Sequence, residues 1–576
     1  MQKANPATFD ASVAASPSLP AALPGGLPGK RGRAGSGTEV IGLLGRARAS
    51  VERLSDRQLA LVVSAVLFAV AAWPIALTEV PPYQDLPNHL AAVTVLQNPA
   101  MYPEFVSNGF IKTNAALFTW LFFVGKVVGV RLASRLFALL VLALNAIVLP
   151  KLVLQLTGSR KKLIVASFFM WPMVHNWFVS MGMLDFALGV PLSLLVVVFL
   201  DRQRQAPSWK NVAAIATFSA LTWYAHVFAL LVVNLLVAVH VVTRRSLALR
   251  IREAAILMVP LAPTTLLAMW SFYDHMTEPV GAMTANVNLE QLLPVWELLY
   301  NLWAEWLWGF TKLSISSFVP AVGLFVIALW RRREAPAFFS PAAFVLLACL
   351  YFFSPYIATN WFHVNSRQIP FLWICALLRV PDALPKKALT LLGVSAVLYS
   401  VGMGVDFVRL DRDRQKFTAG IAAVPEGATL LPMLFRRQLT SENTRSLLHS
   451  WGYYVEEKHT SAPLLFAHSR SFPVMYRTPP PPRFNHLLLE SFAPNMVSSD
   501  WLCNRMLAGD IFVGDCAAVW RQLWAEFWRD ATPRFDHILM WDPKPEVQAL
   551  VPANYRVKFR QDRLTIYERV STVVHP

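Results

Sequence analysis

Long apolar runs follow one another from about residue 59 to residue 404, and few charged residues interrupt them. A transmembrane helix needs about 20 mostly apolar residues, because each residue advances about 1.5 Å through a hydrocarbon core about 30 Å thick. Clear examples are Leu59–Leu77, Phe137–Val153, Val212–Val242 and Ala388–Gly404. The pattern predicts a polytopic α-helical membrane protein.

We expect about eleven spans, because the run from 211 to 243 is too long for one helix and is better split near His226. Two further segments, Ala115–Val130 and Asn288–Phe310, are expected to lie along the outer membrane surface. The predicted spans are 58–79, 134–156, 163–180, 185–200, two within 211–243, 253–272, 315–330, 341–357, 367–381 and 388–405.

The sequence on either side of the spans has a different character. Residues 1–57 are rich in Ala, Pro, Gly and Ser and predict a disordered cytoplasmic tail before the transmembrane domain, 58–405. Residues 406–576 resemble an ordinary globular sequence and predict an extracytoplasmic α/β domain. Its expected strands are Thr429–Leu434, Pro463–His468, His537–Trp541 and Leu564–Tyr567, and its expected helices are Asp500–Met506 and Ala517–Trp528.

The net charge of +17 suggests nucleic acid at first, but the chain is 55% hydrophobic and only 15% charged. Its basic residues fall between apolar runs, as in cytoplasmic loops of membrane proteins. We therefore expect no nucleic-acid partner, a cytoplasmic N-terminus and an outer C-terminal domain. The clusters are Arg160-Lys161-Lys162, Arg202 with Arg204, Arg244-Arg245 with Arg250, Arg331-Arg332-Arg333, and Arg379 with Lys386-Lys387.

Four cysteines are present, and two of them, Cys503 and Cys516, lie in the C-terminal part. If that part faces an oxidising compartment, they can form a disulfide. Two buried free thiols are an equally good interpretation, and the sequence leaves both open.

Two aspartates stand at the predicted outer ends of spans, where a carboxylate is costly and therefore suggests function. Asp85 follows the first span, and Asp185 lies between the third and fourth. An aspartate there can deprotonate an acceptor or ligate a divalent metal. Alternatively, Asp85 caps a helix that begins at Leu86, with Pro87 in its first turn.

Other polar residues are predicted on the same outer face. His89 is four residues after Asp85 and would share its helix face, while His226 and His363 lie between later spans. Arg367 begins a span and offers a guanidinium fork for a phosphate. Snorkelling of Arg367 to the membrane surface is the alternative.

The layout of a span, an Asp-bearing outer loop, a short apolar surface helix and an Arg-Leu pair resembles the C-type (GT-C) membrane glycosyltransferases. The likeness is greatest to the protein mannosyltransferase and lipid A aminoarabinose transferase branch. Asp185 stands where that branch often has a second outer aspartate. The motifs that carry the resemblance are Tyr83-Gln84-Asp85-Leu86-Pro87-Asn88-His89, Ala116-Leu117-Phe118-Thr119-Trp120-Leu121 through Gly129, Ala133-Ser134-Arg135-Leu136, Tyr224-Ala225-His226, and Ser366-Arg367-Gln368-Ile369-Pro370.

The resemblance implies an inverting glycosyltransferase of a bacterial inner membrane, with a periplasmic C-terminal domain. It would move a sugar from a polyprenyl-phosphate donor to a glycan, lipid or protein acceptor. Asp85 and Asp185 would be catalytic, and the substrate-binding residues would be His89, Lys126, His226, His363 and Arg367. The family usually has Asp-Glu in its first loop, whereas Leu86 follows Asp85 here, so a divalent cation stays an open question.

Two other classes compete with a transferase. One is a transporter or flippase for lipid-linked glycans, although transporters usually place polar groups near the bilayer midplane rather than at one face. The other is an assembly subunit for envelope glycans, in which the C-terminal domain docks a partner.

Overall fold

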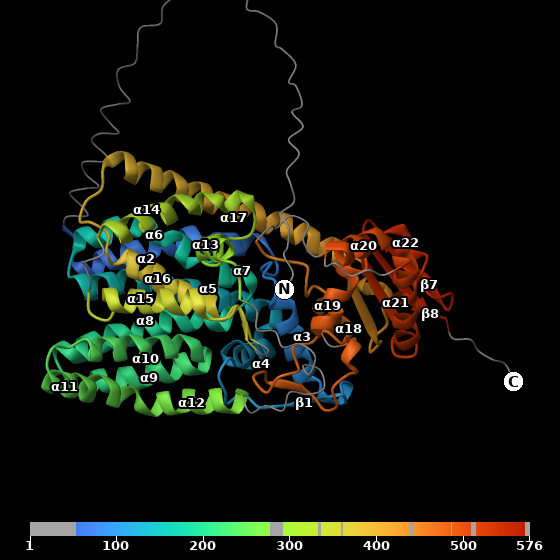
Figure 1. Ribbon diagram of the computed structural model, residues 1–576, viewed down its shortest axis with the longest axis horizontal. Helices are drawn as coiled ribbons and strands as arrows, with labels where there is room; N and C mark the ends of the chain where they lie inside the picture. The colour runs from blue at the N-terminus through green and yellow to red at the C-terminus, as the bar shows by residue number, and fades with distance from the viewer. Residues whose placement is uncertain are drawn as a thin grey trace, which may run out of the picture.

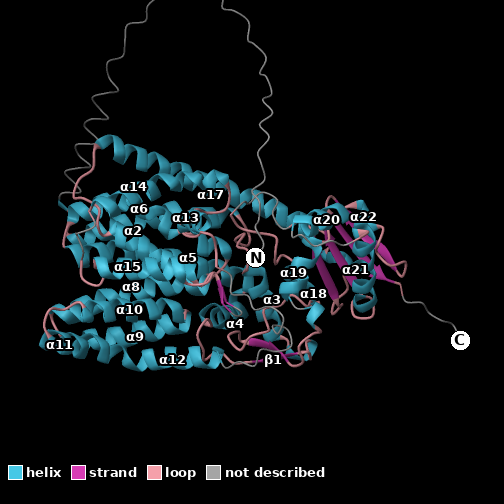
Figure 2. Ribbon diagram, in the orientation of Figure 1, coloured by secondary structure: helices cyan, strands magenta, loops and turns pink. Residues whose placement is uncertain are grey.

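The computed structural model describes residues 53–276, 292–331, 336–358, 361–436, 443–484, 486–508 and 514–570. Long helices form a bundle, and a smaller domain with a sheet lies beyond one end of it (Figure 1). Strands gather mainly in that smaller domain (Figure 2). Most of the predicted tail, residues 1–52, lies outside the described residues, as does the start of the predicted surface segment Asn288–Phe310.

Seven helical stretches of the described chain are long and apolar enough to cross a membrane. They are Asp56–Leu77, Val130–Thr157, Arg160–Met181, Leu184–Gln205, Leu247–Asp274, Lys312–Trp330 and Lys386–Ala423, and shorter apolar helices cover Ala116–Val128, Val227–Val242 and Pro341–Phe353. Helices occupy every predicted span, and the chain is a multi-pass membrane protein. The count of eleven stays a prediction.

The individual elements of the bundle are named as in Figure 1. They are α2 (Asp56–Ala72), α3 (Leu86–Gln97), α4 (Ala116–Val128), α5 (Val130–Thr157), α6 (Arg160–Val174), α7 (Trp177–Met181), α8 (Leu184–Gln205), α9 (Trp209–Ala225), α10 (Val227–Val242), α11 (Leu247–Met258), α12 (Ala262–Met276), α13 (Val295–Ala304), α14 (Phe318–Trp330), α15 (Pro341–Phe353), α16 (Ile369–Leu377) and α17 (Lys386–Thr418). Short 3₁₀ turns join several of them, among them η1 (Trp73–Leu77), η4 (Lys312–Ser317) and η5 (Asn365–Gln368).

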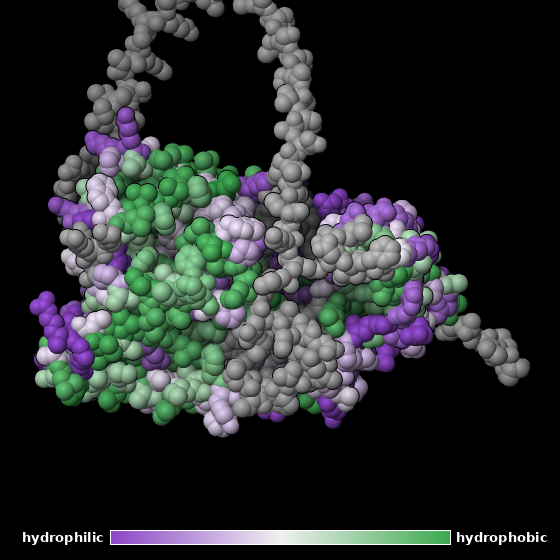
Figure 3. Space-filling model, viewed as in Figure 1, coloured by the Kyte–Doolittle hydropathy of each residue, from purple (hydrophilic) through white to green (hydrophobic). Residues whose placement is uncertain are grey.

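Apolar side chains cover much of the visible face of the bundle, whereas polar ones gather toward its ends and on the C-terminal domain (Figure 3). A soluble monomer rarely exposes an apolar surface of this extent, because water contact with it is unfavourable. Lipid is its natural solvent. Exposed members on α2 and α17 include Leu61, Val62, Val66, Leu391, Val394, Val397 and Leu398.

The predicted division of the long run 211–243 is confirmed. Helix α9 ends at Ala225, α10 begins at Val227, and His226 between them has an extended backbone with φ −164° and ψ 119°. The chain therefore reverses at His226, and the side chain of this residue lies where two helices meet.

Basic clusters of the described chain lie where α5 is joined to α6, α8 to α9 and α10 to α11, and we call this end of the bundle the basic end. Its ion pairs join the ends of different helices: Arg160 Nε lies 3.3 Å from Asp56 Oδ1, and Arg244 Nη2 lies 3.2 Å from Glu253 Oε1. The helix α8 runs from Asp185 to this end and is about 33 Å long at 1.5 Å per residue. We call the opposite end, with the turns near 78–85, 175–185, 225–227 and 362–368, the outer end.

Helix α17 runs 33 residues without interruption, so the predicted domain boundary at 406 falls inside it. Figure 1 shows it leading from the bundle into the C-terminal domain. There the strands β4 (Leu430–Leu434), β6 (His537–Trp541), β8 (Leu564–Arg569) and β7 (Tyr555–Gln561) form a sheet in that order. The pair β4 and β6 is parallel, and the other pairs are antiparallel.

Helices pack on this sheet, and large aromatic side chains such as Trp524 and Trp541 fill its core. A polytopic helical membrane protein with a C-terminal α/β domain is thus confirmed. The helices of this domain are α18 (Gly452–Lys458), α19 (His486–Asn495), α20 (Ser499–Ala508), α21 (Cys516–Ala531) and α22 (Pro545–Gln548), of which α19 packs on β4 and α18 packs mainly on α3.

One predicted strand, Pro463–His468, is wrong. This apolar segment forms turns that are buried against α3, where Asn88 Nδ2 donates to Leu464 O at 3.1 Å and Phe466 N donates to Asn88 Oδ1 at 3.1 Å. A side chain thus satisfies the backbone groups that a neighbouring strand would otherwise bind. A short pair of strands, β1 (Phe105–Ser107) with β5 (Val474–Tyr476), fastens the same region to the first outer loop.

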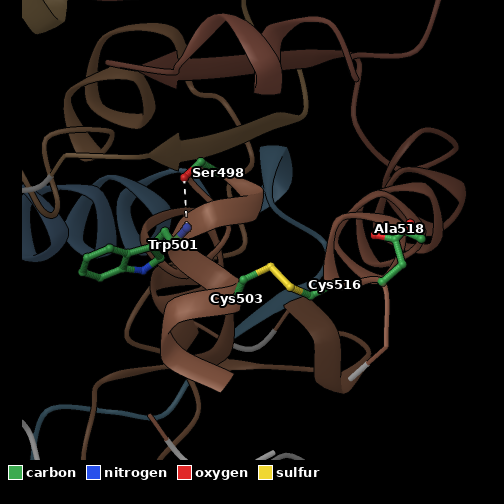
Figure 4. Close-up of a disulfide and its surroundings, with 6 residues drawn as sticks. Ser498, Trp501, Cys503, Cys516 and Ala518 are labelled. Atoms are coloured by element: carbon green, nitrogen blue, oxygen red, sulfur yellow. Dashed lines mark hydrogen bonds between the residues drawn. A yellow bond between two sulfur atoms is a disulfide. The ribbon is translucent and has the colours of Figure 1, made fainter. Parts of the chain in front are cut away.

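The C-terminal domain contains a disulfide between Cys503 on α20 and Cys516 at the start of α21 (Figure 4). This decides between the two interpretations that the sequence left open. The other two cysteines, Cys349 on α15 and Cys375 on α16, are free.

Candidate active site at the outer end

Asp85 precedes α3, as predicted, but it does not cap that helix with its side chain. The capping interpretation is therefore wrong, and the carboxylate is available for other contacts. The backbone N–H of Asp85 donates to Met181 O at 2.9 Å, which fixes the loop against the end of α7. Gly182 permits this approach, because its φ is +84° and a Cβ there would lie 2.8 Å from Asp85 N.

The contacts of the Asp85 carboxylate fall on one of its two oxygens. Gln84 Nε2 donates to Oδ1 at 3.3 Å, and His449 Nε2 lies 3.3 Å from the same atom. Within the described residues Oδ2 accepts no hydrogen bond, and 16% of the side chain is exposed. One oxygen is thus held while the other can receive a proton.

His449 comes from the C-terminal domain and was missed by sequence reasoning. Its side chain is 2% exposed, and its second nitrogen, Nδ1, lies 3.6 Å from Glu490 Oε1 on α19. No local motif surrounds His449, so only the tertiary fold places it beside Asp85.

His89 lies near Asp85, as the spacing of four residues predicted. Its backbone N–H donates to Asp85 O at 3.2 Å, and its ring packs against Phe118 and Phe466 at centroid distances of 5.0 and 6.1 Å. Burial lowers the pKa of His89 to about 4, although the Asp85 carboxylate acts in the opposite sense. The imidazole is consequently neutral at neutral pH.

Asp185 occupies the first turn of α8 and is buried. Its Oδ1 accepts a hydrogen bond of 2.8 Å from Leu117 N in the first turn of α4. An acidic group at a helix N-terminus satisfies an unpaired N–H and interacts favourably with the helix dipole. Asp185 therefore fixes α4 to the outer end of the bundle.

Arg367 and His226 are in direct contact. Arg367 Nη1 donates to His226 Nε2 at 2.7 Å and Nη2 donates to Phe362 O at 3.3 Å. The guanidinium carbon lies 5.1 Å from the ring centroids of both Phe186 and Phe228. With 6% of the residue exposed, Arg367 does not reach water as snorkelling requires, so that interpretation is wrong.

In the described part of the chain, Arg367 has no anionic neighbour. No carboxylate of the described chain lies within 4 Å of its guanidinium, and its Nε is buried without a hydrogen-bond partner. Arg367 also lies in η5, two residues before α16 begins at Ile369, so the positive end of that helix dipole lies near its positive charge. Both features would be relieved by an anion bound here.

His363 belongs to a neighbouring buried group around Glu305. His363 Nδ1 lies 3.3 Å from Glu305 Oε1, Tyr356 OH donates to the same oxygen at 3.0 Å, and Ser366 Oγ donates to Oε2. The residue Ser366 precedes Arg367, so this group fixes the turn that carries the guanidinium.

Lys126 is not brought against the other candidates. It is exposed near the far end of α4, about 15 Å along the helix from Ala116, and its Nζ lies 4.2 Å from the Phe122 ring centroid.

The remaining candidates surround the corner between α7 and α8. Met181 binds the backbone of Asp85, Asp185 lies four residues later, and the Phe186 ring packs against His226 at a centroid distance of 5.2 Å. The structure therefore brings Asp85, Asp185, His226 and Arg367 to one corner of the outer end.

Among the residues that the structure describes, no group of three or more His, Cys, Asp or Glu side chains is arranged to hold a metal ion.

No family model matches the chain, and no curated protein matches it in sequence. Among solved structures, the chain is similar to ArnT from Cupriavidus metallidurans in the apo state, with 14% identity over 88% of this chain and 97% of that one, at a TM-score of 0.48. The structure of ArnT from the same organism bound to undecaprenyl phosphate is similar as well, with 13% identity over 90% of this chain and 99% of that one, at a TM-score of 0.48. The arabinofuranosyltransferase AftD from Mycobacteria is also similar, with 13% identity over 90% of this chain and 40% of that one, at a TM-score of 0.45.

Proposed function

We propose that the chain is a membrane glycosyltransferase that moves a sugar from a polyprenyl-phosphate donor to an acceptor outside the cytoplasm. One observation carries this proposal: Arg367 is buried near a helix N-terminus, at the same corner as Asp85, and no carboxylate of the described residues pairs with it. A cation in that setting suits a phosphate, and a carboxylate with one open oxygen suits a general base. The sequence motifs support the same reaction.

In the proposed reaction the acceptor oxygen attacks the anomeric carbon of the sugar on the face opposite the phosphate. The bond from that carbon to the phosphate oxygen breaks, and its electron pair leaves with the polyprenyl phosphate. The leaving phosphate gains a negative charge, which Arg367 stabilises directly while His226 holds the guanidinium. Asp85 Oδ2 takes the proton of the acceptor, and the configuration at the anomeric carbon is inverted.

The other predicted residues receive supporting roles in this proposal. Asp185 orients the substrates through α4, whose first turn it binds. His89 lies beside Asp85, and His363 belongs to the group around Glu305 that fixes the turn before Arg367. Lys126 lies farther along α4, where the proposal assigns it contact with the donor at the membrane surface.

The test compares Asp85→Asn with Asp382→Asn in a strain that lacks the native gene. Asp382 is an exposed carboxylate at the basic end, where Ser159 Oγ donates to it at 2.6 Å, so it is a matched control. We expect Asp85→Asn to lower the rate of surface-glycan formation at least about 100-fold, because general-base catalysis is worth about 10² to 10⁴. Unchanged glycan in the Asp85 variant at equal protein level would contradict the proposal.

A binding experiment separates a transferase from a transporter or an assembly subunit. The purified protein should bind undecaprenyl phosphate, and Asp85→Asn should leave this affinity within about twofold while it abolishes transfer. A transporter would still deliver its lipid-linked cargo with Asp85→Asn.

A further inference from the structure

The C-terminal domain contacts the proposed general base directly. His449 Nε2 lies 3.3 Å from Asp85 Oδ1, and Glu490 Oε1 lies 3.6 Å from His449 Nδ1 on the other side of the ring. We propose that His449 and Glu490 are positioning residues for Asp85, so that the transfer site is complete only when the C-terminal domain is docked. This inference rests on the proposed function.

Several contacts hold the segment that carries His449 against the outer end. Arg445 N donates to Gln84 Oε1 at 2.7 Å, and the amide of the same Gln84 donates to Asp85 Oδ1. Asn443 Nδ2 donates to Ala304 O at 3.0 Å, and Trp177 Nε1 donates to Asn443 O at 3.1 Å. The segment is thus tied to the loop before α3, to the end of α13 and to the start of α7, which fixes its position relative to Asp85.

The segment is also fixed after His449. Gly452, at the start of α18, passes so close to α3 that a Cβ there would lie 2.2 Å from Pro87 O. The His449 ring itself packs against Phe466 at a centroid distance of 4.9 Å. Little freedom remains for the imidazole, so it can hold the Asp85 carboxylate in one orientation.

The chemistry of the arrangement suits a group that orients a carboxylate. His449 Nε2 lies against Asp85 Oδ1, and Glu490 Oε1 lies on the other side of the ring, near Nδ1. An imidazole N–H is a hydrogen-bond donor and a carboxylate oxygen is an acceptor, so His449 can hold Asp85 through Oδ1.

Two other histidines lie near His449. His89 on α3 and His486 on α19 both interact with it electrostatically, and burial lowers the pKa of each, so both are neutral at neutral pH. Arg445 contributes its backbone N–H to Gln84. In the described chain, the side chains in contact with Asp85 Oδ1 are those of Gln84 and His449.

The test uses His449→Phe, which keeps a ring but removes both donors, and His449→Gln, which keeps one N–H donor. The full chain is expressed in spheroplasts that lack the native copy and contain the host's own lipid-linked sugars, and the glycan product is followed by mass spectrometry. We expect His449→Phe to lower the rate about 100-fold, as misplacement of a catalytic group does, and His449→Gln to recover about tenfold of that loss. His537→Phe, which changes a histidine on β6 beside Glu568, is the control.

A second readout, besides the recovery in His449→Gln, separates positioning from a merely structural role. The double variant Asp85→Asn/His449→Phe should be no slower than Asp85→Asn alone, because both act through one group. Undecaprenyl phosphate binding should stay unchanged in all of these variants.

The outcomes distinguish the two proposals. If Asp85→Asn abolishes transfer but His449→Phe does not, the inference is wrong and the proposed function stands. If the two losses are additive, or if His449→Gln is as slow as His449→Phe while both are folded, the positioning role is also wrong. If Asp85→Asn itself has no effect, the proposed function fails first.

Discussion

The carboxylates at the two ends of the bundle differ in how many hydrogen bonds they accept. At the basic end, Asp201 accepts from Gln155 at 2.9 Å, from Arg204 at 2.9 Å and from Gln205 at 2.6 Å, so both of its oxygens are occupied. At the outer end, Asp85 is held through Oδ1 alone. A carboxylate fully enclosed by donors has a structural role, whereas one with an open oxygen can still act on a substrate.

Two buried arginines on either side of one helix repeat this difference. Arg379 follows α16 and donates to Cys375 O and Phe339 O, near the negative end of the helix dipole. Arg367 precedes α16, where the dipole opposes its charge. Both are buried without a carboxylate partner among the described residues, so burial by itself does not mark a site. What distinguishes Arg367 is its position at the positive end of the helix dipole.

The largest expected effect concerns which side of the membrane each end faces. Glu426→Cys in the C-terminal domain and Arg245→Cys at the basic end both replace exposed residues. We expect a membrane-impermeant maleimide to label only the first in spheroplasts and both after permeabilisation, because basic loops stay in the cytoplasm. Labelling of Arg245→Cys alone in spheroplasts would reverse the proposed orientation.

The two arginines provide the next test. Arg367→Gln should lower the transfer rate about 100- to 1,000-fold, the usual effect of removing a group that stabilises developing charge. It should also weaken binding of undecaprenyl phosphate. Arg379→Gln is the matched control and should leave the rate per folded molecule within a few-fold. If both variants lose the same fraction of the rate, the position of Arg367 before α16 does not distinguish it from Arg379 after that helix.

The cysteines differ between the two regions as well, since only the C-terminal pair is bonded. Cys503→Ser/Cys516→Ser should lower the free energy of unfolding of the C-terminal domain by about 3 kcal/mol, as expected for a closed loop of this size. Cys349→Ser serves as the control. Denaturation followed by fluorescence measures both, and an unchanged midpoint in the double variant would contradict the prediction.

The smallest effect is expected at Asp185. In Asp185→Ala the Leu117 N–H loses its acceptor, which should cost about 1 kcal/mol, whereas Asp185→Asn keeps an acceptor oxygen. Hydrogen–deuterium exchange of Ala116–Leu121 should accelerate in the Ala variant and change little in the Asn variant. If exchange is the same in both, Asp185 does not hold α4.

Much of the architecture was predictable because hydrophobicity is local. The spans, the division at His226 and most of the C-terminal elements follow from runs of apolar residues and their length. The conformation of Pro463–His468 was not predictable from the sequence, because an apolar segment can form either a strand or a buried turn. The side chain of Asn88, 376 residues from Leu464, decided between them.

The sequence by itself determined which residues stand at the outer ends of spans, since charge and apolar length place Asp85, Asp185, His226 and Arg367 on one side. Only the tertiary structure decided what each of them contacts. It assigned Asp185 to α4 and left Asp85 Oδ2 open. It also brought His449 to Asp85, and Glu490 to His449, from a distant part of the chain. The reason is physical: the cost of burying a charge can be read locally, but the group that compensates it depends on how distant segments pack.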